Sequence, residues 1–175
     1  MEKNYINQVL SDEARELDLY LDQYRQCRHS IKMLQDQKKD IEYDMQHPLS
    51  GMGYDGMPKG NKTSSGAAAL PLKLDSIEHR LEQSINRAAD MMQKIFSVIS
   101  QLPDESDERL ILEYKYINNQ SLRTIGERLG MSKSSVKRKW KRGLNTLAEK
   151  EEIKKLLIEW RRAKDAEYRK RIGID

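Results

Sequence analysis

Residues 121–147 read SLRTIGERLGMSKSSVKRKWKRGLNTL, and this stretch decides the fold. Ser121 and Ser132 each stand where a side-chain oxygen can accept a hydrogen bond from the first turn of a helix. The apolar residues that follow each serine recur at helical spacing. We therefore expect one short helix over 122–129 and a longer helix from 133 to about 150.

The residues between these two helices favour a sharp turn. Gly126 stands where two helices must approach closely, and Gly130, four residues later, can take the left-handed conformation that reverses the chain. Met131 is expected to place an apolar side chain under the turn. The inner faces of the two helices carry the apolar residues expected to form their shared core: Leu122, Ile125, Leu129, Val136, Trp140, Leu144 and Leu147. This register is typical of a helix-turn-helix.

The outer face of the longer helix is strongly cationic. A rotation of about 100° per residue, with Val136 and Trp140 inward, places a polar set outward. Its members are Ser134, Arg138, Lys141, Arg142 and Asn145, with Ser135 and Lys137 beside them. Residues 133–142 include six basic side chains and no acidic one. A merely solvated face is the alternative, but like charges repel each other on a helix and solubility alone favours mixed signs. We therefore expect this face to bind double-stranded DNA.

The position of each residue along this helix predicts its role. The first turns of a recognition helix reach base edges, and later cations meet the flanking phosphates. The residues expected near the bases are Lys133, Ser134, Ser135, Lys137 and Arg138. Lys141 and Arg142, together with Arg123 on the shorter helix, are expected to neutralise phosphates.

The remaining segments predict an all-α fold. Apolar residues recur at helical spacing within an N-terminal helical segment, residues 1–46. Residues 47–71 are rich in Gly, Pro, Ser and Asn, which favours a flexible linker, although a loop that binds a partner is an alternative. Residues 72–101 predict a second long, coiled-coil-like helix.

The second long helix has a single narrow apolar stripe, which we call the 74–102 seam. Its members are Leu74, Ile77, Leu81, Ile85, Ala88, Met92, Ile95, Ile99 and Leu102. One such stripe cannot be buried without a partner. The partner is either the first helix, folded back as a long helical hairpin, or the same helix of a second subunit in a homodimer. The sequence leaves both alternatives open.

The helix-turn-helix is expected to occupy a domain of residues 102–150. Asp104 is a candidate cap for a preceding helix over 105–117. Residues 151–175 continue with an apolar stripe and several basic residues. They form either a helix packed on this domain or a basic arm that adds phosphate contacts, and both interpretations stay open.

Charge is distributed unevenly along the chain. Residues 1–120 carry 15 basic and 20 acidic side chains, whereas residues 121–150 carry nine basic and two acidic ones. A basic block that follows an acidic half is expected where one segment meets a polyanion.

Other classes of function find little support in the sequence. Cys27 is the only cysteine, and His29, His47 and His79 have no ligand-like spacing, so we expect no disulfide, metal or other cofactor. No catalytic motif is recognisable, so an enzyme is not expected. The sequence also lacks a signal peptide and a run of about 18 apolar residues, which predicts a protein that has no membrane contact and stays in the cytoplasm of a bacterial host cell.

The stretch from Leu102 to Leu147 resembles region 4 of bacterial sigma factors. The resemblance rests on Leu-Pro-Asp-Glu at its start, on RLILEYKY over 109–116 and on the helix-turn-helix itself. It implies that this domain reads a promoter element and contacts RNA polymerase. Gly126 and Gly143 stand where the family usually has alanine, which predicts slightly looser helices, by about 1 kcal/mol each at exposed sites.

The layout of the whole chain is similar to phage-encoded ArpU-like late transcription regulators, which combine an N-terminal helix, a loop like residues 56–60, a middle helix and a sigma-region-4-like end. No segment resembles sigma region 2. These resemblances imply a phage or prophage late-gene activator that works with host RNA polymerase. The alternative is a small terminase subunit that recognises DNA for packaging. The DNA-binding end of a recombinase-like enzyme is disfavoured, because no catalytic domain fits in the N-terminal helices.

Overall fold

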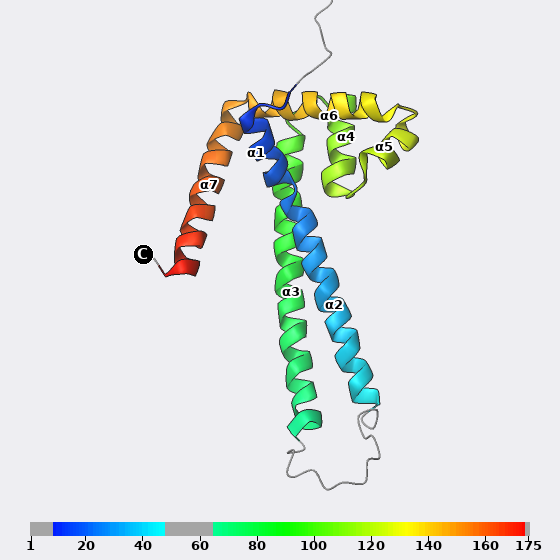
Figure 1. Cartoon of the computed structure of the whole chain (residues 1–175), viewed down its shortest axis with the longest axis vertical. Coiled ribbons are helices and arrows are strands. Elements are labelled where there is room, and N and C mark those ends of the chain that lie inside the picture. The colour runs from blue at the N-terminus through cyan, green and yellow to red at the C-terminus, as the bar shows by residue number, and fades with distance from the viewer. Residues whose placement is uncertain (1–8, 48–64, 174–175) are drawn as a thin grey trace, which may run out of the picture. The chain divides into compact units, whose positions relative to one another are not determined.

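The computed structural model describes residues 9–47 and 65–173, and every regular element in these ranges is a helix (Figure 1). In chain order the elements are α1 (Asp12–Leu21), α2 (Gln23–Gln46), α3 (Ser65–Ile99), α4 (Asp107–Leu112), the π-helical turn η1 (Glu113–Ile117), α5 (Leu122–Leu129), α6 (Lys133–Ala148) and α7 (Glu151–Ile172). The predicted all-α class is therefore confirmed.

The chain divides into two compact units. One unit, which we call the hairpin unit, covers residues 26–89 and so holds most of α2 and of α3. The other, which we call the helix-turn-helix unit, combines residues 1–25 with residues 90–175. The helix-turn-helix unit is therefore built from both ends of the chain.

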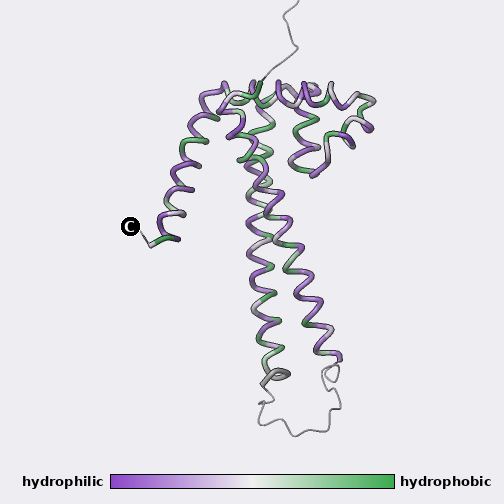
Figure 2. The backbone as a smooth tube through the Cα atoms, in the orientation of Figure 1, coloured by the Kyte–Doolittle hydropathy of each residue, from purple (hydrophilic) through white to green (hydrophobic). Residues whose placement is uncertain are grey.

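In the hairpin unit α2 and α3 run antiparallel (Figure 1). Leu34 of α2 and Ile77 of α3 are buried. The Lys38 ammonium lies 2.6 Å from a carboxylate oxygen of Glu78 and 3.6 Å from one of Glu42. The first helix therefore folds back on the second as a long helical hairpin, one of the two predicted arrangements. Hydrophilic residues occur along the length of both helices (Figure 2).

The apolar spacing predicted one continuous first helix, but the structure divides it into α1 and α2. It breaks at Asp22, whose N–H donates to the carbonyl of Asp18 at 3.0 Å and so closes α1. The Asp22 carbonyl accepts from the N–H of Arg25 at 3.1 Å as α2 begins. The break separates α1, which packs in the helix-turn-helix unit, from the part of α2 that packs in the hairpin unit. Tertiary burial here overrides a helical period that no Gly or Pro interrupts.

The second long helix starts earlier than the sequence predicted. It begins at Ser65, within the expected 47–71 linker, and it contains Pro71. Proline lacks the N–H that would donate to the carbonyl four residues earlier, which disfavours an interior position. The run Ala67–Ala69 before it has the highest helix propensity, which offsets part of that cost. The rest of the expected linker, including residues 56–60, lies in 48–64, outside the described residues.

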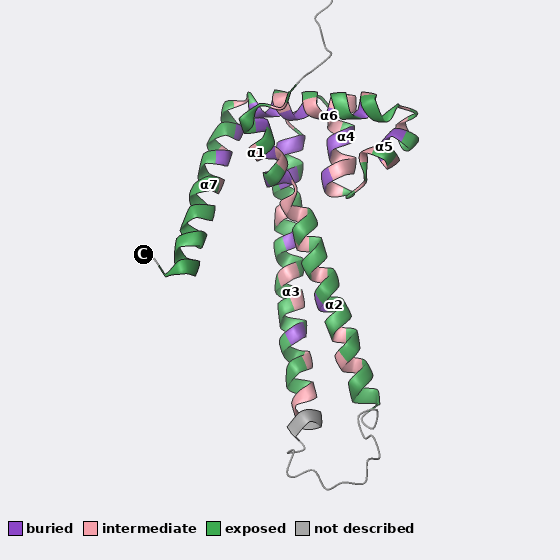
Figure 3. Ribbon diagram, viewed as in Figure 1, coloured by how far each residue is buried: buried purple, intermediate pink, exposed green. Residues whose placement is uncertain are grey.

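The helix-turn-helix unit has one hydrophobic core to which α1, the end of α3, α4, η1, α5, α6 and α7 all contribute. Figure 3 shows buried positions gathered on α1, α4 and α6. From α1 the buried side chains are Ala14, Leu17, Tyr20 and Leu21. The first ten helical residues of the chain therefore belong to the same core as its C-terminal helices.

The first half of α7 packs on this unit, and its second half does not. Ile153 and Leu157 are buried, and the Trp160 ring meets the Tyr20 ring edge to face at 5.7 Å. The Arg161 guanidinium donates to both carboxylate oxygens of Glu16 at 2.8 and 2.6 Å. Residues 161–173 are exposed. The packed-helix interpretation thus holds for the first half, and a role of the second half as a basic arm stays a prediction.

More than half of the 74–102 seam residues are buried by contacts within the chain itself. Ile77 and Ala88 are buried, as are Ile95, Ile99 and Leu102 near its end. Its middle is open, with Ile85 47% and Met92 38% exposed. Leu74 and Leu81 are half-buried, so Ile85 and Met92, on either side of the buried Ala88, are the exposed members of the seam that a second subunit could cover.

In the described ranges no helix is long and apolar enough to cross a membrane. The same ranges hold no group of three or more His, Cys, Asp or Glu side chains placed to bind a metal ion.

If α1 is part of the core of the helix-turn-helix unit, Leu17→Ala should lower the free energy of unfolding of the whole unit by about 2–5 kcal/mol, because it leaves a cavity. Leu17 is 0% exposed and Leu19, on the same helix, is 61% exposed. Leu19→Ala is thus the matched control and should change stability by about 0.5 kcal/mol or less. Urea unfolding followed by tryptophan fluorescence measures both, and equal effects of the two variants would contradict the assignment.

Candidate nucleic-acid interface

Capping side chains set the ends of α5 and α6 as the sequence predicted. The Ser121 hydroxyl accepts from the N–H of Thr124 at 3.1 Å, and the Ser132 hydroxyl accepts from the N–H of Ser135 at 3.2 Å. Gly130 closes α5 in the left-handed conformation, with φ 62° and ψ 29°. The predicted helix-turn-helix is confirmed, and α6 ends at Ala148, close to the predicted residue 150.

Both glycines of this region lie at close helix contacts. A Cβ added to Gly126 would come 2.7 Å from the carbonyl oxygen of Met131, which is closer than packed atoms allow. A Cβ on Gly143 would come 3.2 Å from the Glu108 Cβ and 3.3 Å from a methyl carbon of Leu112. Both glycines are buried. The predicted close approach at Gly126 is therefore confirmed, and Gly143 permits a similar approach of α4 to α6. Neither glycine lies at an exposed site, the case for which a cost of about 1 kcal/mol was expected.

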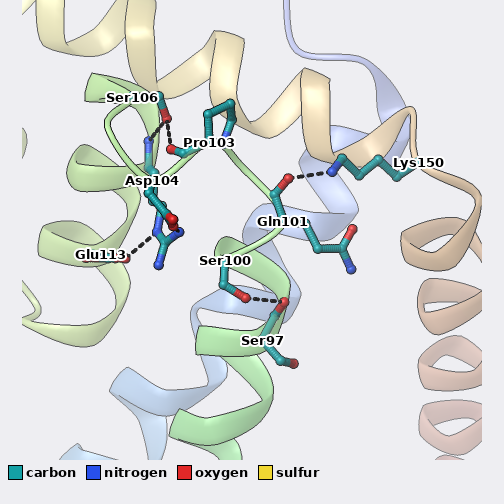
Figure 4. A network of polar contacts seen from close by, with 9 residues as sticks. Ser97, Ser100, Gln101, Pro103, Asp104, Ser106, Glu113 and Lys150 are labelled. Carbon is teal, nitrogen blue, oxygen red and sulfur yellow. Dashed lines mark hydrogen bonds and ion pairs between the residues drawn. The ribbon is translucent and has the colours of Figure 1, made fainter.

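The helix before the motif starts later than predicted, and its cap differs. The Ser106 hydroxyl, not the Asp104 carboxylate, accepts from the first turn of α4, from the N–H of Arg109 at 3.2 Å. Asp104 instead forms an ion pair with the Arg109 guanidinium, which also donates to Glu113 at 2.9 Å (Figure 4). A serine followed directly by two acidic residues was the signal for this cap.

A lysine between α6 and α7 contacts the connection between α3 and α4. The Lys150 ammonium donates to the carbonyl oxygen of Gln101 (Figure 4). Ser106 also donates its hydroxyl proton to the carbonyl of Pro103 at 2.8 Å. Two carbonyls of this connection, those of Gln101 and Pro103, therefore have partners, and α4 packs against α6 after it.

The inner face of α6 lies as predicted. Val136, Trp140, Leu144 and Leu147 are all buried. Ile125 of α5 is buried as well, and Leu122, Leu129 and Met131 are half-buried against the same core. The rotation of α6 about its own axis is thereby fixed.

The opposite face of α6 presents cations to solvent. Lys133, Ser134, Lys137 and Arg138 are exposed, and Ser135 and Lys141 are half-buried. Within the described part of the chain no ion pair involves the cations that we call the free cations of α6: Lys133, Lys137, Arg138 and Lys141. These charges have no protein partner to give up before they meet an anion.

The other two cations of α6 face α4 and are paired there. Lys139 forms an ion pair with Asp107, and Arg142 with Glu108, whose side chain is 13% exposed. Arg142 had been expected among the phosphate contacts; it is exposed, but one of its guanidinium nitrogens is held by Glu108. The acidic residues of α4 thus divide the cations of α6 into a paired set and a free set, which the sequence reasoning did not foresee.

Two further residues differ from a simple outward face. Arg123 is exposed and pairs with Glu127 at 3.0 Å, an exposed pair of little energetic weight that leaves the arginine available. Asn145, expected to point outward, is covered, because its amide oxygen accepts from the N–H of Ser11 at 3.2 Å and its amide nitrogen donates to the carbonyl of Val9 at 3.4 Å. Asn145 is therefore half-buried and held by residues 9–11, one turn after Lys141.

The comparisons agree with this geometry. Residues 98–149 match the family Sigma-70, region 4. The match begins near the end of α3 and ends just after α6, so it contains the turn, both of its helices and α4. No curated protein and no solved structure is significantly similar to the chain. Residues 98–149 therefore form a sigma-70 region-4-like helix-turn-helix, a DNA-binding domain with a role in transcription.

Proposed function

We propose that the chain is a sequence-specific double-stranded DNA-binding regulator of transcription, and that it activates phage or prophage late genes together with host RNA polymerase. The observation that carries the DNA-binding part is the row of free cations on the solvent side of α6, inside a segment that matches sigma region 4. Nothing in this proposal requires catalysis.

The charges favour a polyanion as partner. Each phosphate that a protein cation neutralises releases a condensed counterion, and this release drives binding at low salt. The free cations have no carboxylate partner within the described ranges, whereas Lys139 and Arg142 form ion pairs with Asp107 and Glu108 of α4. The free cations also flank the serines of the first turn, whose hydroxyls can donate to phosphates or base edges.

Position along α6 supports a division of roles. Arg138 lies two residues before the buried Trp140, on the side of α6 opposite to the core. A guanidinium there can donate two parallel hydrogen bonds to one guanine. Lys141 is farther along and closer to the covered end of the helix, which suits a phosphate contact that any sequence can satisfy.

The resemblance of the layout to ArpU-like regulators supports the late-gene role, and the resemblance to sigma region 4 supports contact with RNA polymerase. A homodimer is supported by the exposed middle of the 74–102 seam, Ile85 and Met92. Two helix-turn-helix units in one dimer would read two half-sites.

The division of roles predicts that Arg138→Ala and Lys141→Ala differ in kind. Arg138→Ala should weaken binding to a selected DNA site by about 1–3 kcal/mol and relax specificity at one base pair. Lys141→Ala should weaken binding to all sequences alike and lower the slope of log K against log salt by about 1. Fluorescence anisotropy with selected and scrambled duplexes at several salt concentrations measures both.

Arg142→Ala is the control for these two variants. It removes a cation from the same helix, but one that Glu108 holds. We expect it to lower the free energy of unfolding by about 1–3 kcal/mol, because the largely buried Glu108 carboxylate loses its partner. Its effect on the salt slope should be smaller than that of Lys141→Ala. Equal loss of specific and nonspecific binding in all three variants would contradict the assignment of roles.

The regulatory part is tested by transcription in vitro. A template that carries the selected site upstream of a promoter should yield more transcript with bacterial RNA polymerase when the protein is added, and Arg138→Ala should abolish the increase. Tight specific binding that leaves transcription unchanged would rule out an activator. A large ring of subunits in native mass measurements would instead favour the packaging role of a small terminase subunit.

A further inference from the structure

Helix α1 reaches the inner face of α6 through a short chain of hydrogen bonds. The Trp140 indole N–H donates to the Tyr116 hydroxyl at 2.9 Å, and that hydroxyl donates to the Asp18 carboxylate at 2.5 Å. Trp140 and Tyr116 are both buried. The Asp18 carboxylate of α1 therefore holds the Tyr116 hydroxyl in place, and this hydroxyl in turn holds the Trp140 indole of α6.

The polar groups of this hydrogen-bond chain all have partners. The Lys115 ammonium lies 3.2 Å from the same Asp18 oxygen, 4.2 Å from the centre of the Tyr116 ring and 4.8 Å from the Trp140 ring. Burial, and then the charge of Asp18, raise the pKa of the Tyr116 hydroxyl well above its ordinary value, so the hydroxyl stays a donor. Tyr116 and Trp140 are buried and Asp18 and Lys115 are partly exposed, and a network whose members all have partners holds one geometry.

A second contact ties the start of α1 to the same helix. The N–H of Ser11, which also caps α1, donates to Asn145, and Asn145 donates to the carbonyl of Val9. Asn145 lies five residues after Trp140, which is about 7.5 Å along a helix at 1.5 Å per residue. Residues 9–18 therefore hold α6 at two separate points, and both points lie near residues proposed to contact DNA.

We propose that α1 sets the orientation of α6 for reading DNA, and that Asp18 is a positioning residue for base recognition through Tyr116 and Trp140. Trp140 lies between Arg138 and Lys141 in the sequence of α6. A change in the position of its indole therefore moves the side chains of Arg138 and Lys141. Asp18 lies outside the segment that matches sigma region 4, so this role comes from a part of the chain that the match does not include. The inference rests on the proposed DNA binding.

Specific and nonspecific binding respond differently to such a displacement. Paired hydrogen bonds to a base need an accurate placement of the helix, whereas a lysine follows a phosphate over a range of positions. Loss of the Asp18 contact should therefore lower specific affinity more than nonspecific affinity.

The test is made in the full chain. It compares variants that break the hydrogen bond between Asp18 and Tyr116 with a variant of Glu16, another carboxylate on α1. Asp18→Ala and Tyr116→Phe each break the hydrogen-bond chain, and Asp18→Asn keeps an oxygen that can accept from Tyr116 while it removes the charge. Glu16→Gln is the matched control, because Glu16 lies on the same helix but pairs with Arg161 of α7.

We expect Asp18→Ala and Tyr116→Phe to lower affinity for the selected duplex about tenfold, a typical coupling within one hydrogen-bond network. Affinity for scrambled duplex and the salt slope should stay near those of the wild type. Asp18→Asn should lie between the wild type and Asp18→Ala, and Glu16→Gln should bind like the wild type. If Asp18→Ala fails to fold, Asp18→Asn and Tyr116→Phe carry the comparison.

A readout without DNA separates this inference from the proposed function. The indole N–H resonance of Trp140, assigned against Trp160→Phe, should shift in Asp18→Ala and not in Glu16→Gln. If the wild type binds no DNA, the proposed function fails. If, in addition, the Trp140 resonance does not shift in Asp18→Ala, the positioning role of Asp18 is also overturned. If DNA binds and the folded Asp18 and Tyr116 variants keep wild-type specificity, or if Glu16→Gln loses as much as they do, Asp18 has no positioning role.

Discussion

The burial of Trp140 against the protein is the contact on which the rest of the structure depends. With Trp140 and Val136 inward, α6 can present only one face to solvent, and that face carries the free cations. The buried indole also needs an acceptor for its N–H, which Tyr116 provides. The same side chain thus fixes the rotation of α6 and links it to the N-terminal helix.

Opposite charges on α4 refine this face. Asp107 and Glu108 take up the two cations of α6 that lie nearest to them. Gly143 allows α4 to come that close, because a side chain there would meet Glu108 and Leu112. Without these carboxylates, Lys139 and Arg142 would add two unpaired cations to the surface of α6. Packing and charge together leave one narrow cationic face.

The sequence was sufficient where local chemistry decides the conformation. The caps at Ser121 and Ser132 and the left-handed Gly130 depend on residues within a few positions, and all three are as predicted. Reasoning from the sequence failed where distant contacts decide. The break at Asp22 and the packing of α1 depend on partners such as Tyr116, 98 positions from Asp18, and no periodicity reveals such a pair. The pairing of Arg142 with Glu108 was hidden for the same reason, since the rotation of a single helix shows which face is outward but not what lies beside it.

The segment that matches sigma region 4 is smaller than the unit that folds around it. Residues 98–149 hold the helices that define the motif, but their inner surfaces are covered in part by Leu17 and Leu21 of α1 and by Ile153 and Leu157 of α7. A domain of that length buries too small a share of its surface to be very stable by itself, and added helices increase the buried apolar area. Here the added helix α1 also carries the carboxylate that meets Tyr116. Because α1 leads directly into α2, the residues that stabilise the DNA-binding unit and those that begin the hairpin unit lie on one short piece of chain. The N-terminal segment is therefore as much a part of the DNA-binding unit as the motif that identifies it.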